Sequence, residues 1–96
     1  MEEARHERIR AVVAAIPHGR WCGYGDVASA AGERSPRVVG TVLATDGADL
    51  PWHRVLRAGG TSAPHIAAEQ QRRLAAEGVP VRDGRADPAH RWSPDS

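Results

Sequence analysis

The sequence of 96 residues has one cysteine, no lysine and no long apolar run, and each absence narrows the class of protein. Because Cys22 is the only cysteine, no internal disulfide can form, which is typical of proteins in a reducing cytoplasm. No apolar stretch approaches the ~20 residues that a membrane-spanning helix needs, and the charged residues 1–5 lack the apolar block of a signal peptide. The histidines show no spacing typical of metal ligands. We therefore expect a cytoplasmic protein with no membrane partner, no metal and no other cofactor.

An excess of charge of one sign is also missing. The 13 basic and 12 acidic side chains give a formal net charge of +1, far from the basic excess of many nucleic-acid-binding proteins. A nearly neutral protein should hold ordinary nucleic acid weakly at physiological salt. All 13 basic residues are arginine. This reflects either a coding bias or a use for planar guanidinium groups, which stack and form paired hydrogen bonds where lysine cannot.

The residues that are present are enough for one small domain spanning residues 1–96. Apolar residues make up 41 % of the sequence, and a chain of this length buries about 60–65 % of the surface that its unfolded form exposes. No repeat or linker divides the sequence. We therefore expect a single domain that acts as a monomer.

Three helices are predicted in the first half of the sequence. Residues 2–16 carry apolar side chains at helical spacing, and residues 24–31 form a short alanine-rich helix that ends at Gly32. A third helix begins with Ser35 as N-cap and Pro36 at its first position, and it continues to about residue 45. Its expected buried side chains are Val38, Val39, Val42 and Leu43.

The two short helices and the tight turn between them predict a helix-turn-helix with residues 36–45 in the recognition position. Residues 55–57 indicate a small strand, residues 65–77 a helix capped by Gly78, and residues 79–81 an extended segment. Residues 83–96 are expected to form a loosely packed tail held only by Trp92. The predicted fold is therefore mainly α, a winged helix-turn-helix DNA-binding domain with a small β wing.

The outward face of the predicted recognition helix presents mostly small residues: Arg37, Gly40, Thr41 and Ala44. A helix that reads base edges in the major groove normally offers several long hydrogen-bonding side chains. This face instead favours close approach to a nucleic-acid backbone or a shallow groove. The alternative is that Gly40 and Ala44 only allow two helices to pack closely.

Three motifs occur in order: Tyr24-Gly25-Asp26-Val27-Ala28, Arg37-Val38-Val39-Gly40 and Pro51-Trp52-His53-Arg54-Val55. Over roughly residues 16–78 the sequence resembles the O6-alkylguanine-DNA alkyltransferases, which move an alkyl group from guanine to the cysteine of a proline-cysteine-histidine-arginine site. Here Trp52 stands at the cysteine position, and an indole has no thiolate to accept the alkyl group. The sequence is therefore similar to the alkyltransferase-like proteins, which bind O6-alkylguanine in DNA without repairing it.

The resemblance implies a minor-groove interface, with DNA-binding residues Tyr24, Ser35, Arg37, Gly40, Thr41 and Ala44. Arg37 matches the arginine finger that fills the space left by a flipped nucleotide, and its guanidinium can stack and form hydrogen bonds at once. Tyr24 matches the tyrosine that crowds the phosphate 3′ of the target nucleotide. Because the turn before the helix is short, Arg34 is a second candidate for the finger.

The resemblance also implies a lesion pocket formed by Tyr24, Pro51, Trp52 and Val55, with Trp52 as a flat apolar wall and the backbone supplying hydrogen bonds to the guanine edge. Trp52, His53 and Glu77 are then a vestige of the catalytic site. His53 is expected as a core histidine and Arg54 as a structural arginine. Cys22 lies outside any such motif and is expected to be inert.

Two departures from the enzymes bear on this pocket. Asp46 replaces a hinge asparagine, which puts its contact with the active-site turn in doubt. The loop of residues 59–64 lacks the run that closes the enzyme pocket, so a wider pocket is expected.

We therefore predict a sensor of DNA damage that is not an enzyme. It would bind O6-alkylguanine in double-stranded DNA, flip the base into a pocket without alkyl transfer, and flag the lesion for nucleotide excision repair proteins. The alternatives are a sequence-specific winged-helix transcriptional regulator and an enzyme with residual alkyltransferase activity through Cys22 or His53.

Overall fold

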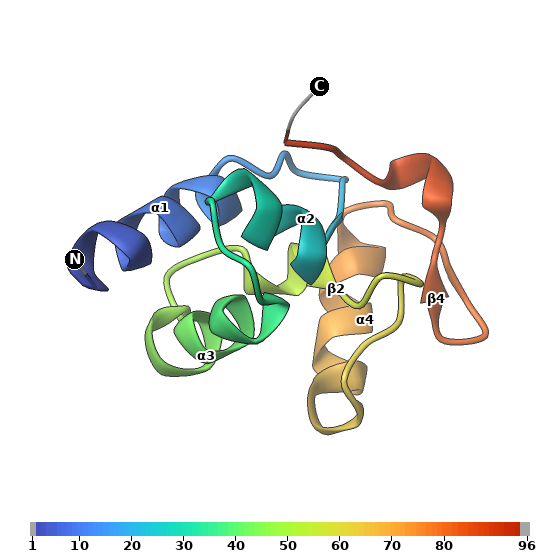
Figure 1. Ribbon diagram of the computed structural model, residues 1–96. Coiled ribbons are helices and arrows are strands. Elements are labelled where there is room, and N and C mark those ends of the chain that lie inside the picture. Colours follow the sequence, from blue (N-terminus) through green and yellow to red (C-terminus); the bar gives the residue numbers. More distant parts are fainter. Residues whose placement is uncertain (1, 95–96) are drawn as a thin grey trace.

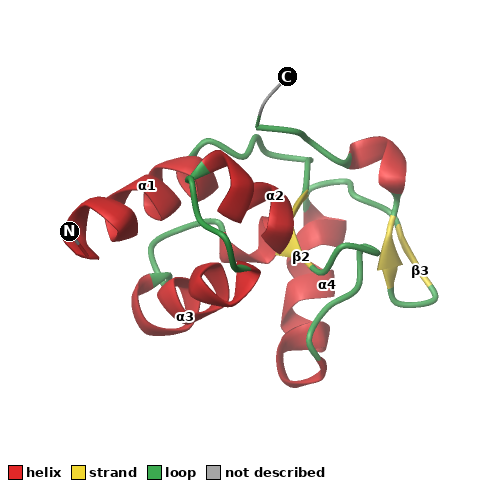
Figure 2. Ribbon diagram, viewed as in Figure 1, coloured by secondary structure: helices red, strands yellow, loops and turns green. Residues whose placement is uncertain are grey.

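The computed structural model describes residues 2–94. Figure 1 shows α1 (Glu2–Ala14), α2 (Tyr24–Ala30) and α3 (Pro36–Asp46) on one side of the molecule, and α4 (Ala67–Ala76) with a small hairpin on the other. Figure 2 shows how little of the chain is in strands, which agrees with the predicted fold that is mainly α with a small β wing. None of the helices within residues 2–94 is long and apolar enough to cross a membrane.

The three N-terminal helices form where local signals predicted them. Ile9 and Val13 of α1 are fully buried, and Ile16 just beyond its end is 1 % exposed. The hydroxyl of Ser35 accepts a hydrogen bond from the backbone N–H of Arg37 at 3.2 Å, so the predicted N-cap of α3 is confirmed.

The apolar side of α3 is narrower than expected. Val39 and Val42 are buried in the main core cluster, whereas Val38 and Leu43 pack against that cluster and remain half-buried. The prediction that all four are buried is therefore wrong for Val38 and Leu43. Leu43 lines a surface pocket next to α3, so part of its side chain remains exposed.

Residues 2–94 contain two small sheets, and one of them joins the N-terminal half of the chain to the C-terminal half. The strand β2 (Val55–Leu56) was expected, and it pairs in parallel with β1 (Cys22–Gly23), which was not. The register joins Cys22 to Val55 and Gly23 to Leu56, which brings the start of α2 beside the segment after β2. An antiparallel hairpin of β3 (Val81–Arg82) and β4 (Arg85–Ala86) forms the wing.

Helix α4 follows a short 3₁₀ turn, η2 (Pro64–Ile66), and is tied to the centre of the fold by Gln70. The Gln70 side chain is 1 % exposed, and its Nε2 donates to the backbone oxygens of His53 at 3.2 Å and Val55 at 2.7 Å. Leu74, one turn later, is also buried. This fixes α4 against the 3₁₀ turn η1 (Trp52–Arg54).

The expectation of a loosely packed tail is wrong for the described residues 83–94. Beyond β4, the chain forms the 3₁₀ turn η3 (Pro88–His90) and encloses Trp21. The backbone N–H of Trp21 donates to His90, its carbonyl accepts from Trp92, and its indole N–H donates to the carbonyl of Asp87 at 2.8 Å. Trp92 is therefore one of several contacts that hold this segment in place. Residues 95–96 lie outside the described part of the chain.

Candidate DNA interface and base pocket

The outward face of α3 consists of the small residues that the sequence indicated. Arg37, Thr41 and Ala44 are exposed and Gly40 is half-buried. The hydroxyl of Thr41 donates to the carbonyl of Arg37 at 3.1 Å, so it is turned back onto its own helix. The side chain of Arg37 makes no hydrogen bond or ion pair with residues 2–94. The face is smooth apart from this one guanidinium.

Gly40 decides between the two explanations of the small residues on α3. A Cβ atom built at Gly40 would meet no other part of the described protein within 4 Å. Close helix packing therefore does not require a glycine there. The space in front of Gly40 is therefore accessible to a binding partner.

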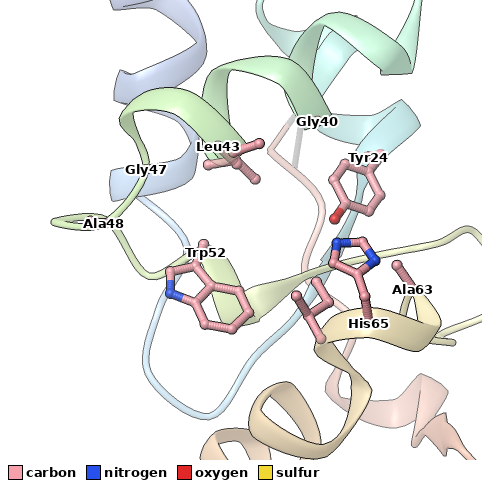
Figure 3. Close-up of a pocket in the computed structure, with 10 residues that line it drawn as sticks. Tyr24, Gly40, Leu43, Gly47, Ala48, Trp52, Ala63 and His65 are labelled. Carbon is pink, nitrogen blue, oxygen red and sulfur yellow. The ribbon is translucent and has the colours of Figure 1, made fainter.

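Gly40 and Ala44 also form one wall of a pocket of about 410 Å³ between α3, η1 and η2. The pocket is lined by Tyr24, Gly40, Leu43, Ala44, Gly47, Ala48, Trp52, Ala63, His65 and Ile66. In Figure 3, Tyr24 and His65 lie together at one end of the pocket, and Trp52 lies below Leu43. The walls are mainly apolar, and their polar side-chain groups are the Tyr24 hydroxyl, the His65 imidazole and the Trp52 indole N–H.

The Trp52 ring is held in place from behind the pocket. The Arg73 guanidinium lies 5.2 Å from the ring centroid in a cation–π contact, and Glu69 accepts a hydrogen bond from Arg73 at 2.7 Å. The His53 ring meets the indole edge-on, with centroids 6.2 Å apart. Trp52 is thus a half-buried pocket wall whose ring is also in contact with Arg73 and His53.

Two of the four predicted pocket residues do not line this cavity. Val55 is fully buried in β2, where its N–H donates to Trp52 and its carbonyl accepts from Gln70. Both backbone groups are therefore already used and cannot bind a guanine edge. Pro51 is half-buried and precedes the turn without lining the cavity.

Sequence reasoning missed His65, although it had predicted a helix starting there. The inward positions Gln70 and Leu74 predict that Ile66, on the same face, also points inward. Its neighbour His65 then lies at the pocket edge, in the 3₁₀ turn η2 that precedes α4. Of the loop of residues 59–64, Ala63 alone lines the cavity.

Behind Trp52, a connected polar cluster forms around Glu77. His53 Nε2 lies 2.7 Å from Glu77 Oε2, and Arg54 donates to Glu77 at 2.7–3.2 Å through Nε and one terminal nitrogen. The Gly19 N–H donates to the same carboxylate at 3.0 Å. Arg54 also donates to the carbonyl of Ile16 at 2.8 Å, so its expected structural role is confirmed.

The electrostatics of this cluster follow from its geometry. Burial of Glu77 opposes its ionisation, but the hydrogen bonds from Arg54, Gly19 and His53 outweigh it and lower the pKa of Glu77 from 4.5 to about 2. Glu77 is therefore a fixed anion that orients His53. The other ring nitrogen of His53, Nδ1, is buried and has no hydrogen-bond partner among residues 2–94.

The remaining candidates lie away from the pocket. Cys22 is fully buried in β1. The carboxylate of Asp46 bonds to α1, at 2.7 Å from His6 Nε2 and 3.4 Å from Arg10, and not to the turn that carries Trp52. Arg34 is exposed in the turn before α3 and borders a separate hollow with Arg5 and Arg8.

A helix-turn-helix with a small wing, an open recognition face and an adjacent pocket defines a DNA-binding domain of the alkyltransferase type. The family model for the 6-O-methylguanine DNA methyltransferase, DNA binding domain, matches residues 4–79. The chain belongs to that family, and it is an alkyltransferase-like member of it.

Named relatives are similar over nearly the whole chain. The DNA base-flipping protein of Escherichia coli (strain K12) is 42 % identical over 96 % of this chain and 77 % of its own length, and that of Shigella flexneri matches equally. The crystal structure of S. pombe Atl1 in complex with damaged DNA containing O6-carboxymethylguanine superimposes with a TM-score of 0.83 at 27 % identity, covering 97 % of both chains. A second S. pombe ATL structure in complex with DNA gives 0.79 at 28 % identity with the same coverage.

Proposed function

We propose that this protein is a sensor of O6-alkylguanine in double-stranded DNA. It binds the minor groove with the outward face of α3, flips the damaged base into the pocket lined by Trp52, and does no chemistry on it. The observation that carries this proposal is the pocket itself, which opens beside Gly40 and Ala44 and has the Trp52 indole as a wall. The resemblance implies that this indole stands where the alkyltransferases have a thiol.

The shape of the interface supports minor-groove binding. A smooth helix face with an open space at Gly40 allows close approach to the sugar–phosphate backbone, and proteins that bind the minor groove read little base sequence. Arg37 is then free to enter the base stack in place of the flipped nucleotide. Tyr24, between this face and the pocket, is placed to crowd the neighbouring phosphate.

The lesion itself helps the protein to select it. Flipping a base costs a few kcal/mol, and it costs least where pairing is already weakened. An O6-alkyl group removes a Watson–Crick donor from guanine, so the damaged nucleotide leaves the stack more readily than a normal one. The mainly apolar walls of the pocket suit the alkyl group, and its width suits adducts larger than methyl.

The absence of alkyl transfer follows from the groups that surround the pocket. Trp52 has no ionisable thiol, and the one cysteine of the chain is fully buried in β1. The wider proposal is that a monomer in the cytoplasm, bound to the nucleoid, marks the lesion for nucleotide excision repair proteins. A passive binder needs such a partner because it repairs nothing.

One titration tests the proposal. Two duplexes that differ only in a single O6-methylguanine are titrated with the protein, and the modified duplex carries a labelled methyl group. We expect tighter binding to the modified duplex, with the label still on the DNA. Equal affinity for both duplexes would overturn the sensor, and transfer of label to protein would favour residual alkyltransferase activity. A transcriptional regulator would instead select a sequence motif from random DNA.

A further inference from the structure

The β wing carries a basic face that the α3 interface does not include. Strand residues alternate in direction, so the pair Val81 and Ala86 faces the core while the pair Arg82 and Arg85 faces solvent. Both arginines are exposed and border one shallow hollow with Gly59. The two-residue turn between the strands is Asp83-Gly84, and its tight geometry keeps the two arginines side by side.

A third arginine connects this wing to the residue expected to contact the target nucleotide. The parallel register ends with Gly23 opposite Leu56, so the next position places Arg57 beside Tyr24. Burial raises the pKa of the Tyr24 phenol and the positive charge of Arg57 opposes that rise, so the two groups lie within electrostatic reach. Arg57 is bonded through its backbone to Thr61, and Thr61 bridges to Arg85. The three arginines therefore belong to one continuous strip from Tyr24 to the hairpin.

The guanidinium groups of this strip are not neutralised within the described residues 2–94. Arg57, Arg82 and Arg85 take part in none of the ion pairs of that part of the chain. Of the nearby carboxylates, Asp26 pairs with Arg91 at 2.6 Å. Asp83, in the turn between Arg82 and Arg85, forms none of the ion pairs found among residues 2–94. Asp87 accepts the Ala89 N–H as the cap of η3. Three free cations in a chain of net charge +1 form a local concentration of positive charge.

We propose that Arg57, Arg82 and Arg85 form a second phosphate-binding strip, which holds the backbone of the damaged strand beyond the phosphate that Tyr24 crowds. This inference rests on the proposed function, because it takes the DNA to lie against α3 and Tyr24. Exposed guanidinium groups on a β hairpin contact phosphate oxygens without reading bases. The strip would resist the rotation of the duplex while one nucleotide is out of the stack.

Salt dependence separates this role from that of a base-replacing arginine. Loss of one phosphate contact lowers the slope of log affinity against log salt by about 0.9, equally for damaged and undamaged duplex. The experiment measures both duplexes by fluorescence anisotropy between about 50 and 200 mM KCl. The proteins are the wild type, Arg57→Ala, the double variant Arg82→Ala/Arg85→Ala, and Arg20→Ala as the matched control.

Arg20 is exposed in the loop between α1 and β1, which lies on the opposite side of the molecule from α3 in Figure 1. Its removal changes the net charge by the same unit without touching the strip. We expect a slope lower by about 0.9 for Arg57→Ala and by nearly twice that for the double variant, with little change for Arg20→Ala. The ratio of lesion to normal affinity should stay the same in all of them.

If the strip variants have the same salt slope as Arg20→Ala, the strip does not bind phosphate. This conclusion would hold even if the lesion preference is intact. If the wild type shows no preference for the lesion, the proposed function is wrong. The salt slopes on undamaged duplex would still decide whether the strip binds phosphate. Thermal melting of each variant checks that these exposed substitutions leave the fold unchanged.

Discussion

Two polar regions adjoin Trp52, and they differ in how their hydrogen-bonding groups are used. Behind the ring, Glu77 accepts from Arg54, Gly19 and His53, so that α4, η1 and the loop after α1 are bonded together. In front of it, the Tyr24 hydroxyl and the His65 imidazole make no hydrogen bond to residues 2–94. The polar groups behind the ring thus hold the fold together. The groups that face the pocket are left for a ligand.

The largest effect should come from breaking the cluster behind Trp52. Glu77→Gln leaves the half-buried Arg54 guanidinium without its anion, and removing one partner of such a buried pair costs about 3–5 kcal/mol of unfolding free energy. Urea denaturation measures the change. The control is Glu69→Gln on the exposed side of the same helix, where little change is expected. If both variants lose the same unfolding free energy, the cluster stabilises the fold no more than an exposed ion pair does.

Acid should weaken the same cluster without any mutation. The pKa of Glu77 is depressed from 4.5 to about 2 in the folded protein, so its contribution is complete above about 4.5 and is lost as the pH falls towards 2. A shift of this size corresponds to about 3 kcal/mol. Unfolding free energies measured from pH 5 down to about pH 2 should fall more steeply for the wild type than for Glu77→Gln. Parallel curves for the two proteins would contradict this.

Substitutions on the side of the molecule that faces the DNA should change DNA affinity and leave the unfolding free energy unchanged. We expect Arg37→Ala to lower the affinity for a lesion-containing duplex by about 1–3 kcal/mol, as a good stacking or paired contact would. The affinity for undamaged duplex should change less, because the finger acts only when a base is out of the stack. Arg34→Ala at the same salt concentration is the control. A collapse of the affinity ratio with Arg34→Ala alone would reassign the finger, and no change with either would exclude base flipping by this helix.

A smaller effect is expected where the two regions meet at the indole. Arg73→Ala removes the cation–π contact that holds the Trp52 ring, and such contacts at exposed sites contribute about 0.5–1 kcal/mol. We expect that loss in lesion affinity, measured by titration. Arg72→Ala is the matched control, since Arg72 pairs with Glu69 but is not in contact with Trp52. Equal losses would show that charge on α4, and not the ring contact, sets the affinity.

The smallest expected effect is on alkyl transfer. Trp52→Cys recreates the proline-cysteine-histidine-arginine order, yet we expect no fast, stoichiometric transfer of a labelled methyl group. Transfer needs an oriented thiolate in a closed pocket, and geometry comes before residue identity. Here His53 and Glu77 are in place, but Asp46 is bonded to α1 and the pocket is open. Rapid transfer by this variant would mean that the cluster behind Trp52 is still a working relay.

Sequence reasoning recovered the parts of the fold that short-range signals determine. Ser35 and Pro36 mark the start of α3, and apolar spacing marks α1 and α4. The strand β1 has two residues and no local signal, since its pairing depends on Val55 far along the chain. The hairpin was overlooked although Asp83-Gly84 is a favoured two-residue turn.

The sequence motifs predicted some of the residues that line the pocket and missed others. Tyr24 and Trp52 line the pocket because the motif carries their backbone geometry with it. The backbone of Val55 was expected to face the guanine edge, but its N–H donates to Trp52 and its carbonyl accepts from Gln70. His65 was missed because only the packing of α4 against η1 brings it to the pocket edge.

The enclosure of Trp21 has a consequence for the order in which the molecule folds. A nascent chain released as far as residue 80 contains all four α helices, but Trp21 still lacks the carbonyls of Asp87 and His90 and the N–H of Trp92. These contacts span more than half of the sequence, and distant contacts close late because the intervening chain must first be ordered. Trp21, just before β1, is therefore fully enclosed only after the segment beyond the wing has packed against it.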